Sequence, residues 1–260
     1  MDLSIIIVNF LSQKKLANCL RSISESDLSG LSFEVVIVEN NSGEDLVALI
    51  ANYPFVRLVV SKKNLGMGGG NNLGVKNSTG EFILISNPDI VFKPNAIKIL
   101  MAGIKSSKNI SLIGPKLLNP DGSLQYSCAR FPRWYMPILR RTFVGNFFKS
   151  ALADFSMHDF NHNQNVSVDW LFGACFLVRR SDFQEKDLFD ERFFMYFEDT
   201  DLCRRIWKKG QQVWYFADAE VFHDHQRDSA NKNIFSNRLM RIHLKSWWQY
   251  FLKWGFRAKR

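Results

Sequence analysis

The first 105 residues alternate short apolar runs with segments of helical periodicity, and this alternation constrains the fold more than any other feature of the chain. Apolar, β-rich runs predict strands at SIIIVNF, FEVVIVEN, VRLVVS and GEFILIS. Helical spacing is found in KKLANCLRSI, SGEDLVALIANY and PNAIKILMAGI, with Ser42 as the expected N-cap of the second helix and Pro94 opening the third. Strands that alternate with helices form a parallel sheet covered by helices. We therefore expect an α/β fold with a mostly parallel, doubly wound sheet flanked by helices.

The charge of the chain is distributed unevenly along its 260 residues. Residues 226–260 hold nine Lys or Arg and one acid, whereas residues 1–225 hold 25 basic and 24 acidic residues. Almost all of the net charge of +9 therefore lies in the tail, which indicates an anionic partner there. We predict one main domain over 1–225 and a basic C-terminal extension over 226–260.

Cysteine usage and the N-terminal residues indicate a cytoplasmic protein. The cysteines, at positions 19, 128, 175 and 203, show no CxxC spacing, which favours reduced, buried thiols over zinc ligands or disulfides. The start, MDLSIIIVNF, lacks the basic residues and cleavage site of a secretory signal. No apolar run approaches the ~18 to 20 residues that span a bilayer.

A carboxylate follows the predicted strand FILIS, in the tripeptide Asn87-Pro88-Asp89. Ligand sites of open α/β sheets lie outside the carboxyl ends of strands. A hard divalent cation prefers oxygen ligands, and one carboxylate with diphosphate oxygens commonly holds it. Taken alone, Asn-Pro-Asp is equally typical of a turn that ends a strand. Together with the acids at 198–199 and His223, it predicts a metal–diphosphate site and transfer from a nucleotide-activated donor.

Glycines cluster in NLGMGGGNNLGVKNSTG at 64–80 and not after the first strand. The GxGxxG of a dinucleotide-binding fold is therefore missing from its place, and the GxxxxGK[ST] of a P-loop is absent. Such glycines allow backbone to approach a ligand or a helix to pack tightly on the sheet. The alternative is a flexible start of a helix. Asn71 and Asn72, which follow directly, can both donate and accept hydrogen bonds.

A second acidic group opens the predicted helix EDTDLCRRIWKKG. The helix dipole favours acidic residues in the first turn of a helix whether or not they are catalytic, and this effect alone explains an acid at position 201. Glu198 and Asp199 are candidates for a general base, which must reach within hydrogen-bond distance of its proton. His223 follows the strand-like VWYFADAEVF and is a candidate metal ligand or a structural histidine. The irregular FPRWYMPILRRTFVGNFF predicts a loop or short helices that recognise an acceptor, or a surface excursion without function.

The chain resembles the inverting family 2 glycosyltransferases of GT-A fold. The resemblance covers residues 3–226 and rests on motifs in the family's order: SIIIVNF, VIVENNSGE, NLGMGGGNNLGV, ISNPDIVF, WLFGACFLVRRSDF, LFDERFFMYFEDTDLCRRIWKKG and VFHDH. Within the family, the chain is most similar to bacterial rhamnosyltransferases that build O-antigen or related polysaccharide. The resemblance therefore implies a GT-A catalytic domain over 1–225.

The resemblance assigns residues to the donor side of the site. The nucleotide and its sugar are expected to contact Asn9, Glu39, Asn64, Gly66, Asn71, Asn72, Asn87 and Asp89. Glu39 stands where the family more often has Asp, and Asn87 stands where the first acid of a DxD motif is usual. A Mg²⁺ or Mn²⁺ ion is therefore expected on Asp89, the diphosphate and His223.

The resemblance also assigns the acceptor side. Asp199 corresponds to the base that deprotonates the acceptor hydroxyl, and Glu198 positions the acceptor or tunes Asp199. Trp170, Gly173 and Ala174 are expected to form the floor under donor and acceptor. The implied reaction is a single displacement with inversion, from dTDP-β-L-rhamnose to a hydroxyl of a lipid-diphosphate-linked saccharide.

The tail predicts an amphipathic helix from Arg238 to Trp254. Its basic face carries Arg241, Lys245, Gln249 and Lys253, and its apolar face carries Met240, Leu244, Trp247, Phe251 and Trp254. This pattern is typical of a helix lying on an anionic membrane, and we assign that contact to 238–256. The enzyme would then work at the inner face of the cytoplasmic membrane. The alternative is a helix packed on the main domain with its basic side in solvent.

Other classes of function remain open at this level. A basic, aromatic tail can bind nucleic acid, but the basic residues are confined to the tail, so no nucleic-acid partner is expected. Asn87 in place of an acid admits a non-catalytic nucleotide-sugar binder. Galactosyl, galactofuranosyl and N-acetylglucosaminyl donors are alternatives to rhamnose.

Overall fold

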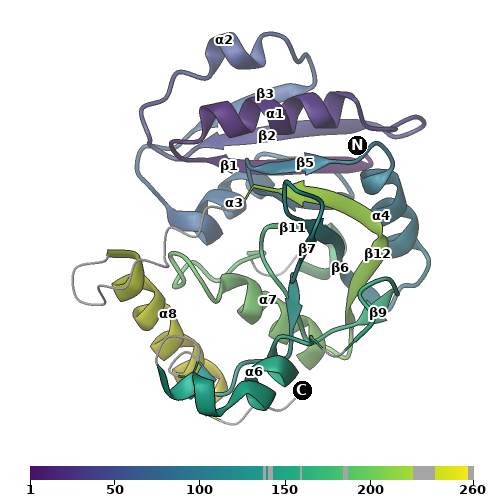
Figure 1. Ribbon diagram of the computed structural model, residues 1–260. Coiled ribbons are helices and arrows are strands. Elements are labelled where there is room, and N and C mark those ends of the chain that lie inside the picture. Colours follow the sequence, from purple (N-terminus) through teal and green to yellow (C-terminus); the bar gives the residue numbers. More distant parts are fainter. Residues whose placement is uncertain (137–138, 140–142, 159, 184–186, 225–237, 257–260) are drawn as a thin grey trace.

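The computed structural model describes residues 1–136, 139, 143–158, 160–183, 187–224 and 238–256 (Figure 1). The strands are β1 (Leu3–Asn9), β2 (Phe33–Glu39), β3 (Val56–Val60), β4 (Phe82–Ser86), β5 (Ile90–Phe92), β6 (Ile110–Leu118), β7 (Leu124–Gln125), β8 (Cys128–Ala129), β9 (Val166–Ser167), β10 (Trp170–Leu171), β11 (Cys175–Arg179) and β12 (Gln212–His223). The helices are α1 (Gln13–Ser24), α2 (Val47–Ile50), α3 (Gly66–Lys76), α4 (Ala96–Lys105), α6 (Lys149–Phe155), α7 (Glu198–Lys208) and α8 (Arg238–Trp254), with 3₁₀ segments η1 (Phe143–Phe147) and η2 (Arg180–Phe183).

The main sheet is mixed, with a parallel half formed by the first strands. Its order is β3-β2-β1-β4-β11-β6-β12-β5, and β7 and β9 pair with β6 and β12. The pairs β3–β2, β2–β1 and β1–β4 are parallel, as is β6–β12, whereas β11 runs antiparallel between β4 and β6. The carboxyl ends of β1, β2 and β4 therefore lie along one edge, where the sequence placed the donor site.

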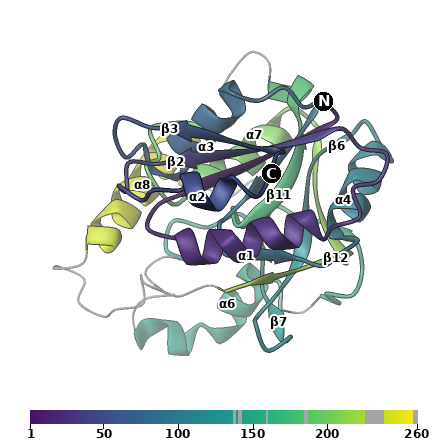
Figure 2. The same ribbon diagram turned by 90° about the horizontal axis from the view of Figure 1, so that it is seen from above.

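Helices cover both faces of the sheet, as Figure 2 shows for α1 and α7. Successive residues of a strand point to opposite faces, and β1 divides accordingly. Ile5 and Ile7 pack with α1 and α4, whereas Ile6 packs in a second cluster with Leu202 and Ile206 of α7. The fold is the GT-A-like α/β arrangement that the sequence predicted.

The predicted helix at 42–53 is wrong over most of its length, because only Val47–Ile50 is helical. Ser42 does not act as its N-cap. Its backbone N–H and hydroxyl instead donate to the carboxylate of Glu39. Glu44 turns back to α1 and accepts the backbone N–H groups of Ser12 and Gln13, at 3.0 and 3.2 Å. A local contact with Glu39 thus takes the predicted cap residue Ser42, and long-range hydrogen bonds to α1 take Glu44.

The C-terminal helix spans 238–254 as predicted and packs on the main domain. Its Tyr250 and Phe251 share a buried cluster with Phe193 and Phe197, which precede α7. No helix within the described residues is both long and apolar enough to cross a membrane. The predicted boundary between 225 and 226 falls at the start of a segment outside the described residues.

Candidate active site

The nucleotide side of the predicted site lies at the ends of β1 and β2, where Asn9 and Glu39 are register partners. Both side chains are buried. Asn9 Nδ2 donates to Glu44 Oε2 at 2.8 Å, while Asn9 Oδ1 accepts no hydrogen bond from the described residues. The Glu39 carboxylate accepts the backbone N–H groups of Asn41 and Ser42, at 3.1 and 2.6 Å. Glu39 therefore fixes the turn after β2, and Asn9 presents a buried acceptor that a ligand donor can satisfy.

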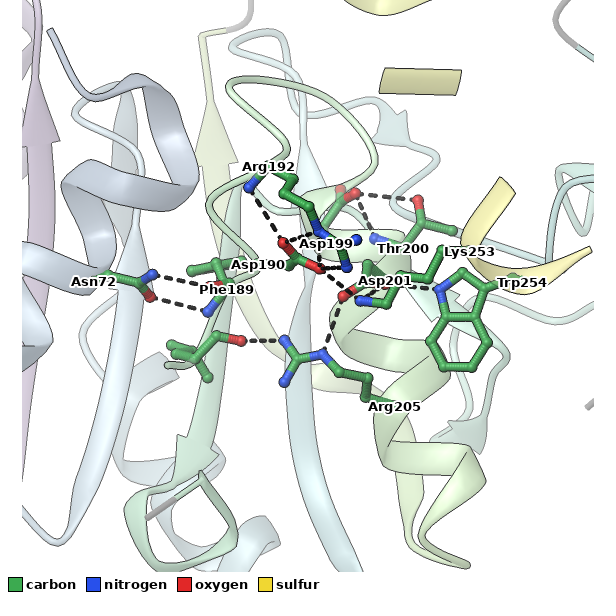
Figure 3. A network of polar contacts seen from close by, with 11 residues as sticks. Asn72, Phe189, Asp190, Arg192, Asp199, Thr200, Asp201, Arg205, Lys253 and Trp254 are labelled. Carbon is green, nitrogen blue, oxygen red and sulfur yellow. Dashed lines mark hydrogen bonds and ion pairs between the residues drawn. The ribbon is translucent and has the colours of Figure 1, made fainter. Parts of the chain in front are cut away.

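Four of the residues predicted to contact the donor lie just before α3 or within it: Asn64, Gly66, Asn71 and Asn72. Asn64 Oδ1 accepts the N–H of Gly66 at 2.9 Å. Asn71 Nδ2 donates within the helix at 3.0 Å, and its buried Oδ1 accepts nothing from the described residues. Asn72 donates to and accepts from the backbone of Phe189, at 2.9 Å in each direction (Figure 3). Asn72 thus ties α3 to the loop before α7, and its contact with donor stays a prediction.

The glycines of α3 allow close packing on two sides. Gly66 has φ +73°, and a Cβ there would lie 2.0 Å from the carbonyl oxygen of Phe194. A Cβ at Gly74 would lie 2.3 Å from Ile6 Cγ2 on β1. Both distances are far below a van der Waals contact. The tight-packing interpretation of the glycine cluster is therefore correct at these two positions, and it brings α3 against the loop that leads to α7.

Asp89 lies beside Lys15 and His223 at the other end of the site that is predicted to bind the donor nucleotide. Its Oδ1 is 3.3 Å from His223 Nε2, and its Oδ2 is 3.8 Å from Lys15 Nζ. Burial acts to raise the pKa of Asp89, but the hydrogen bond from His223 and the charges of His223 and Lys15 outweigh it and lower the pKa. Asp89 is therefore ionised at neutral pH. β5 and β12 pair antiparallel through Ile90 and His223, which brings the two predicted metal ligands together.

The Asp89–His223 pair fits a divalent cation that is also held by diphosphate oxygens. His223 Nδ1 lies 2.5 Å from Gln125 Oε1, an acceptor that orients the ring with Nε2 toward Asp89. A carboxylate oxygen and an imidazole nitrogen are suitable ligands for Mn²⁺ or Mg²⁺. No group of three or more Cys, His, Asp and Glu side chains in the described part of the chain could hold a metal. The remaining ligands would thus come from the diphosphate and water.

Glu198 and Asp199 begin α7 and are both buried. Asp199 Oδ2 accepts the N–H of Gly173 at 2.8 Å, and Oδ1 accepts the N–H and the hydroxyl of Thr200 at 2.6 and 3.2 Å. Glu198 Oε2, by contrast, is buried without a hydrogen-bond partner among the described residues. The two adjacent carboxyl groups therefore have different surroundings, one rich in donors and one poor.

These surroundings assign different protonation states to the pair. Burial, followed by the charge of Asp199, raises the pKa of Glu198 to about 8. Burial also raises the pKa of Asp199, but the N–H groups of Gly173 and Thr200 oppose the shift. A proton shared by two interacting carboxyls resides on the one whose anion has fewer donors. Glu198 is thus the neutral acid and Asp199 the carboxylate, which is the form that a general base requires.

A short loop connects the donor side to Asp199. Gly173 donates its N–H to Asp199, and the carbonyl of the next residue, Ala174, accepts the N–H of Asn87 at 2.8 Å. A Cβ at Gly173 would lie 3.2 Å from Asp199 Cβ, so little space is left for a larger residue. Trp170 lies on the preceding strand β10 and also acts to lower the pKa of Asp199. Trp170 and Gly173 therefore lie beside Asp199, and the role of these residues as a floor under donor and acceptor stays a prediction.

Two residues before Glu198 adopt a backbone conformation that is rare for their type. Tyr196 and Phe197 have φ of +69° and +67°, in the left-handed region. For residues other than glycine this costs on the order of 1–2 kcal/mol each and persists only where the surroundings enforce it. Such strain is common at functional sites. The turn fixes the direction in which α7 presents its first two side chains.

Sequence reasoning missed residues that orient the predicted ones. They are Lys15, Asn40, Glu44, Gln125 and Thr200. Asn40 stood within VIVENNSGE, and its buried side chain accepts the N–H of Leu65 at 2.9 Å. Lys15 lies in the predicted helix KKLANCLRSI and Gln125 in an irregular polar stretch, and no pattern of spacing assigned either residue to the site.

The family comparison agrees with this fold. Residues 4–186 match the family described as glycosyl transferase family 2. An N-acetylglucosaminyl-diphospho-decaprenol L-rhamnosyltransferase of Mycobacterium tuberculosis is 31% identical over 248 residues, covering 86% of this chain and 80% of that protein. Rhamnosyltransferase WbbL of Escherichia coli K12 is 28% identical over 226 residues, covering 84% and 82%. The chain belongs to glycosyl transferase family 2.

Solved structures support the fold. GalNAc-T7, solved with UDP, GalNAc and Mn²⁺, superimposes with a TM-score of 0.71 at 15% identity over 97% of this chain. Residues 1–349 of TarS from S. aureus, in complex with UDP-GlcNAc, give 0.60 at 17% identity over 87%. The chain spans 48% and 59% of those two chains, respectively.

Proposed function

We propose that this protein is an inverting rhamnosyltransferase. It moves L-rhamnose from dTDP-β-L-rhamnose to a hydroxyl of a lipid-diphosphate-linked saccharide during synthesis of O-antigen or a related cell-surface polysaccharide. Two relatives at about 30% identity carry rhamnosyltransferase names, and one name includes a lipid-diphosphate acceptor. The enzymatic part rests on one observation. Asp199 accepts a backbone hydrogen bond from Gly173, and the next residue, Ala174, accepts the N–H of Asn87, so the proposed base and the Asn87–Asp89 segment are joined by a short loop.

On the donor side, the chain supplies buried polar acceptors and a cationic cluster. Asn9 Oδ1 and Asn71 Oδ1 are buried, accept no hydrogen bond from the part of the chain that the structure describes, and would bind hydroxyl or N–H groups of the nucleotide sugar. Lys15 lies beside Asp89 and favours an anionic diphosphate. A Mg²⁺ or Mn²⁺ ion on Asp89 and His223 would neutralise charge on the departing nucleoside diphosphate.

On the acceptor side, Asp199 takes the proton of the acceptor hydroxyl. The oxygen attacks the anomeric carbon while the bond to the diphosphate breaks and its electron pair leaves with the nucleotide. Neutral Glu198 keeps a second negative charge away from the reacting oxygen and can donate a hydrogen bond to the acceptor. One displacement inverts the anomeric centre, so the β-linked donor gives an α-L-rhamnoside.

Donor choice is tested with a panel of dTDP-, UDP- and GDP-sugars in the presence of Mg²⁺ or Mn²⁺. Saturation-transfer NMR reports binding, and nucleotide release reports turnover, so binding without catalysis is recognised. Preference for dTDP-rhamnose is expected. A UDP-sugar preference would retain the enzyme class and reject rhamnose, and a product that keeps the donor's anomeric configuration would reject inversion.

We further propose that α8 lies on an anionic membrane at the cytoplasmic face. Its outward side is apolar, with Leu244, Trp248 and Leu252 exposed by 42%, 50% and 63% at successive intervals of four residues. Arg241 and Lys245 are exposed beside them. This combination is typical of an interfacial helix, and the inward side stays packed on the domain.

Vesicle flotation tests the membrane contact without removing the helix. The full chain is expected to float with vesicles that contain phosphatidylglycerol, and Trp248→Ser with Leu252→Ser to remain in solution. Val47→Ser with Val60→Ser is the control, because it also removes two exposed apolar side chains, at positions outside α8. Equal flotation of the α8 variant and the native chain would reject this contact.

A further inference from the structure

The inward side of α8 holds the strained turn that presents the two carboxyl groups of α7. Ser246 Oγ donates to the carbonyl of Met195 at 2.8 Å. The rings of Tyr196 and His243 lie 5.0 Å apart, and those of Phe197 and Tyr250 lie 5.2 Å apart. Each residue of the segment 195–197 is therefore in contact with α8, although the two elements are distant in sequence.

α8 also neutralises a buried charge in the first turn of α7. Asp201 is fully buried, and its Oδ1 accepts from Lys253 Nζ at 2.6 Å and from Trp254 Nε1 at 2.7 Å (Figure 3). Arg205 Nε, one helical turn onward, donates to Oδ2 at 3.0 Å. Lys253 further contacts Asp190 Oδ2 at 2.7 Å. Lys253 thus joins the loop before the strained turn to the helix after it.

On the opposite side, the same segment is held by α3. The N–H of Met67 donates to the carbonyl of Phe194 at 2.8 Å, and Gly66 leaves no room for movement toward the helix. The turn is therefore enclosed between the donor-side helix and α8. Two consecutive aromatic residues keep a left-handed backbone conformation only when neighbouring elements enclose them, because their backbone otherwise prefers the α and β regions of φ/ψ space.

We propose that α8 is a positioning element of the active site, in which Ser246 and Lys253 hold the Tyr196–Phe197 turn so that Asp199 keeps its hydrogen bonds to Gly173 and Thr200. This inference rests on the proposed role of Asp199 as base. Loss of Lys253 leaves Asp201 with one cation fewer in a buried position, and the first turn of α7 shifts or frays to hydrate it. Misplacement of a base by about 1 Å can cost ~100-fold in rate.

Lys253→Ala and Ser246→Ala test the proposal, with Lys253→Arg as the conservative rescue. The matched control is Lys98→Ala, which removes the ion pair between the exposed Lys98 on α4 and Asp27. We expect Lys253→Ala to lower kcat by about 10- to 100-fold with donor KM within about twofold, and Ser246→Ala to lower it less. Lys253→Arg recovers most of the loss, and Lys98→Ala leaves kcat unchanged.

The pH dependence separates positioning from simple loss of folded protein. If Asp199 loses its N–H donors, its pKa rises further, and the acid limb of kcat/KM moves to higher pH in Lys253→Ala. A purely structural role lowers the active fraction but leaves that limb in place. An unmoved limb, or a wild-type kcat, would overturn the proposal.

A measurement without turnover keeps this inference distinct from the proposed function. Hydrogen exchange of the peptide covering 193–201 is expected to be at least ~10-fold faster in Lys253→Ala and Ser246→Ala and unchanged in Lys98→Ala. If the native chain turns over none of the donors, the proposed function fails, and the exchange result alone decides whether α8 holds the turn. Native-like exchange in both α8 variants would reject it.

Discussion

Replacement of Glu198 by Gln should stabilise the protein at alkaline pH far more than at acidic pH. Glu198 is buried with one oxygen lacking a partner among the described residues, and burial and Asp199 raise its pKa from 4.5 to about 8. The folded protein therefore binds this proton more tightly than the unfolded chain does. The contribution of such a group to the free energy of unfolding is fully present below about pH 4.5, and it is lost as the pH rises toward the folded pKa of about 8. Gln cannot ionise and escapes this loss.

The size of the effect follows from the width of that pH window. Each pKa unit corresponds to about 1.4 kcal/mol, so between pH 5 and pH 8 the native Glu198 loses roughly 3 kcal/mol relative to Gln. For a chain of this size, 1 kcal/mol shifts the melting temperature by about 2–4 °C. The difference in melting temperature between Glu198→Gln and the native protein should therefore grow by at least about 6 °C from pH 5 to pH 8.

Thermal melts at both pH values provide the assay, and Glu25→Gln is the control because that carboxylate is exposed. If the new amide in the Glu198→Gln variant leaves a hydrogen bond unmade, the stability lost is the same at both pH values. This loss therefore cancels when the two melting-temperature differences are compared. A difference that is the same at pH 5 and pH 8 would show that Glu198 is not held neutral, and the assignment of the proton within the pair would be wrong.

Three further changes test other parts of the site. Asp199→Asn should lower kcat at least ~10³-fold while donor binding by saturation-transfer NMR is retained, and a variant with native turnover would exclude Asp199 as base. Asp89→Ala should weaken donor binding and abolish its enhancement by Mn²⁺, which a titration of the metal in both proteins measures. Gly66→Ala should destabilise the fold by ~3 kcal/mol or more in urea because its Cβ meets the Phe194 carbonyl, whereas Gly210→Ala, at a similar φ but with open space, should cost only about 1 kcal/mol.

Local pattern was a good guide where a segment's own residues decide its conformation. β1, β4 and α7 were expected where they occur, because a run of buried apolar residues or a 3.6-residue period requires little from the rest of the chain. The predicted helix at 42–53 is mostly absent because Glu39 takes the N–H and hydroxyl of Ser42 within its own turn, while Glu44 is drawn away to the start of α1.

The C-terminal helix also shows which features local pattern predicts and which depend on packing. Its period predicted the helix 238–254 and placed Lys253 on a basic face with Arg241 and Lys245, but it could not say which side packs on the domain. The structure turns Lys253 inward to Asp190 and Asp201, while Leu244, Trp248 and Leu252 stay exposed. Periodicity fixes relative directions around a helix axis, whereas the direction of the whole helix depends on its partner surface.

By itself, the sequence determined the α/β alternation, the carboxylate at the end of β4 and the acids that open α7, since these depend on composition and local spacing. Only the tertiary structure decided that Ala174 and Gly173 join Asn87 to Asp199. It also decided that Glu198 Oε2 has no hydrogen-bond partner among the described residues, whereas both oxygens of Asp199 accept hydrogen bonds. Burial and the donors that face a carboxyl group set its pKa, and both are properties of how distant segments pack together.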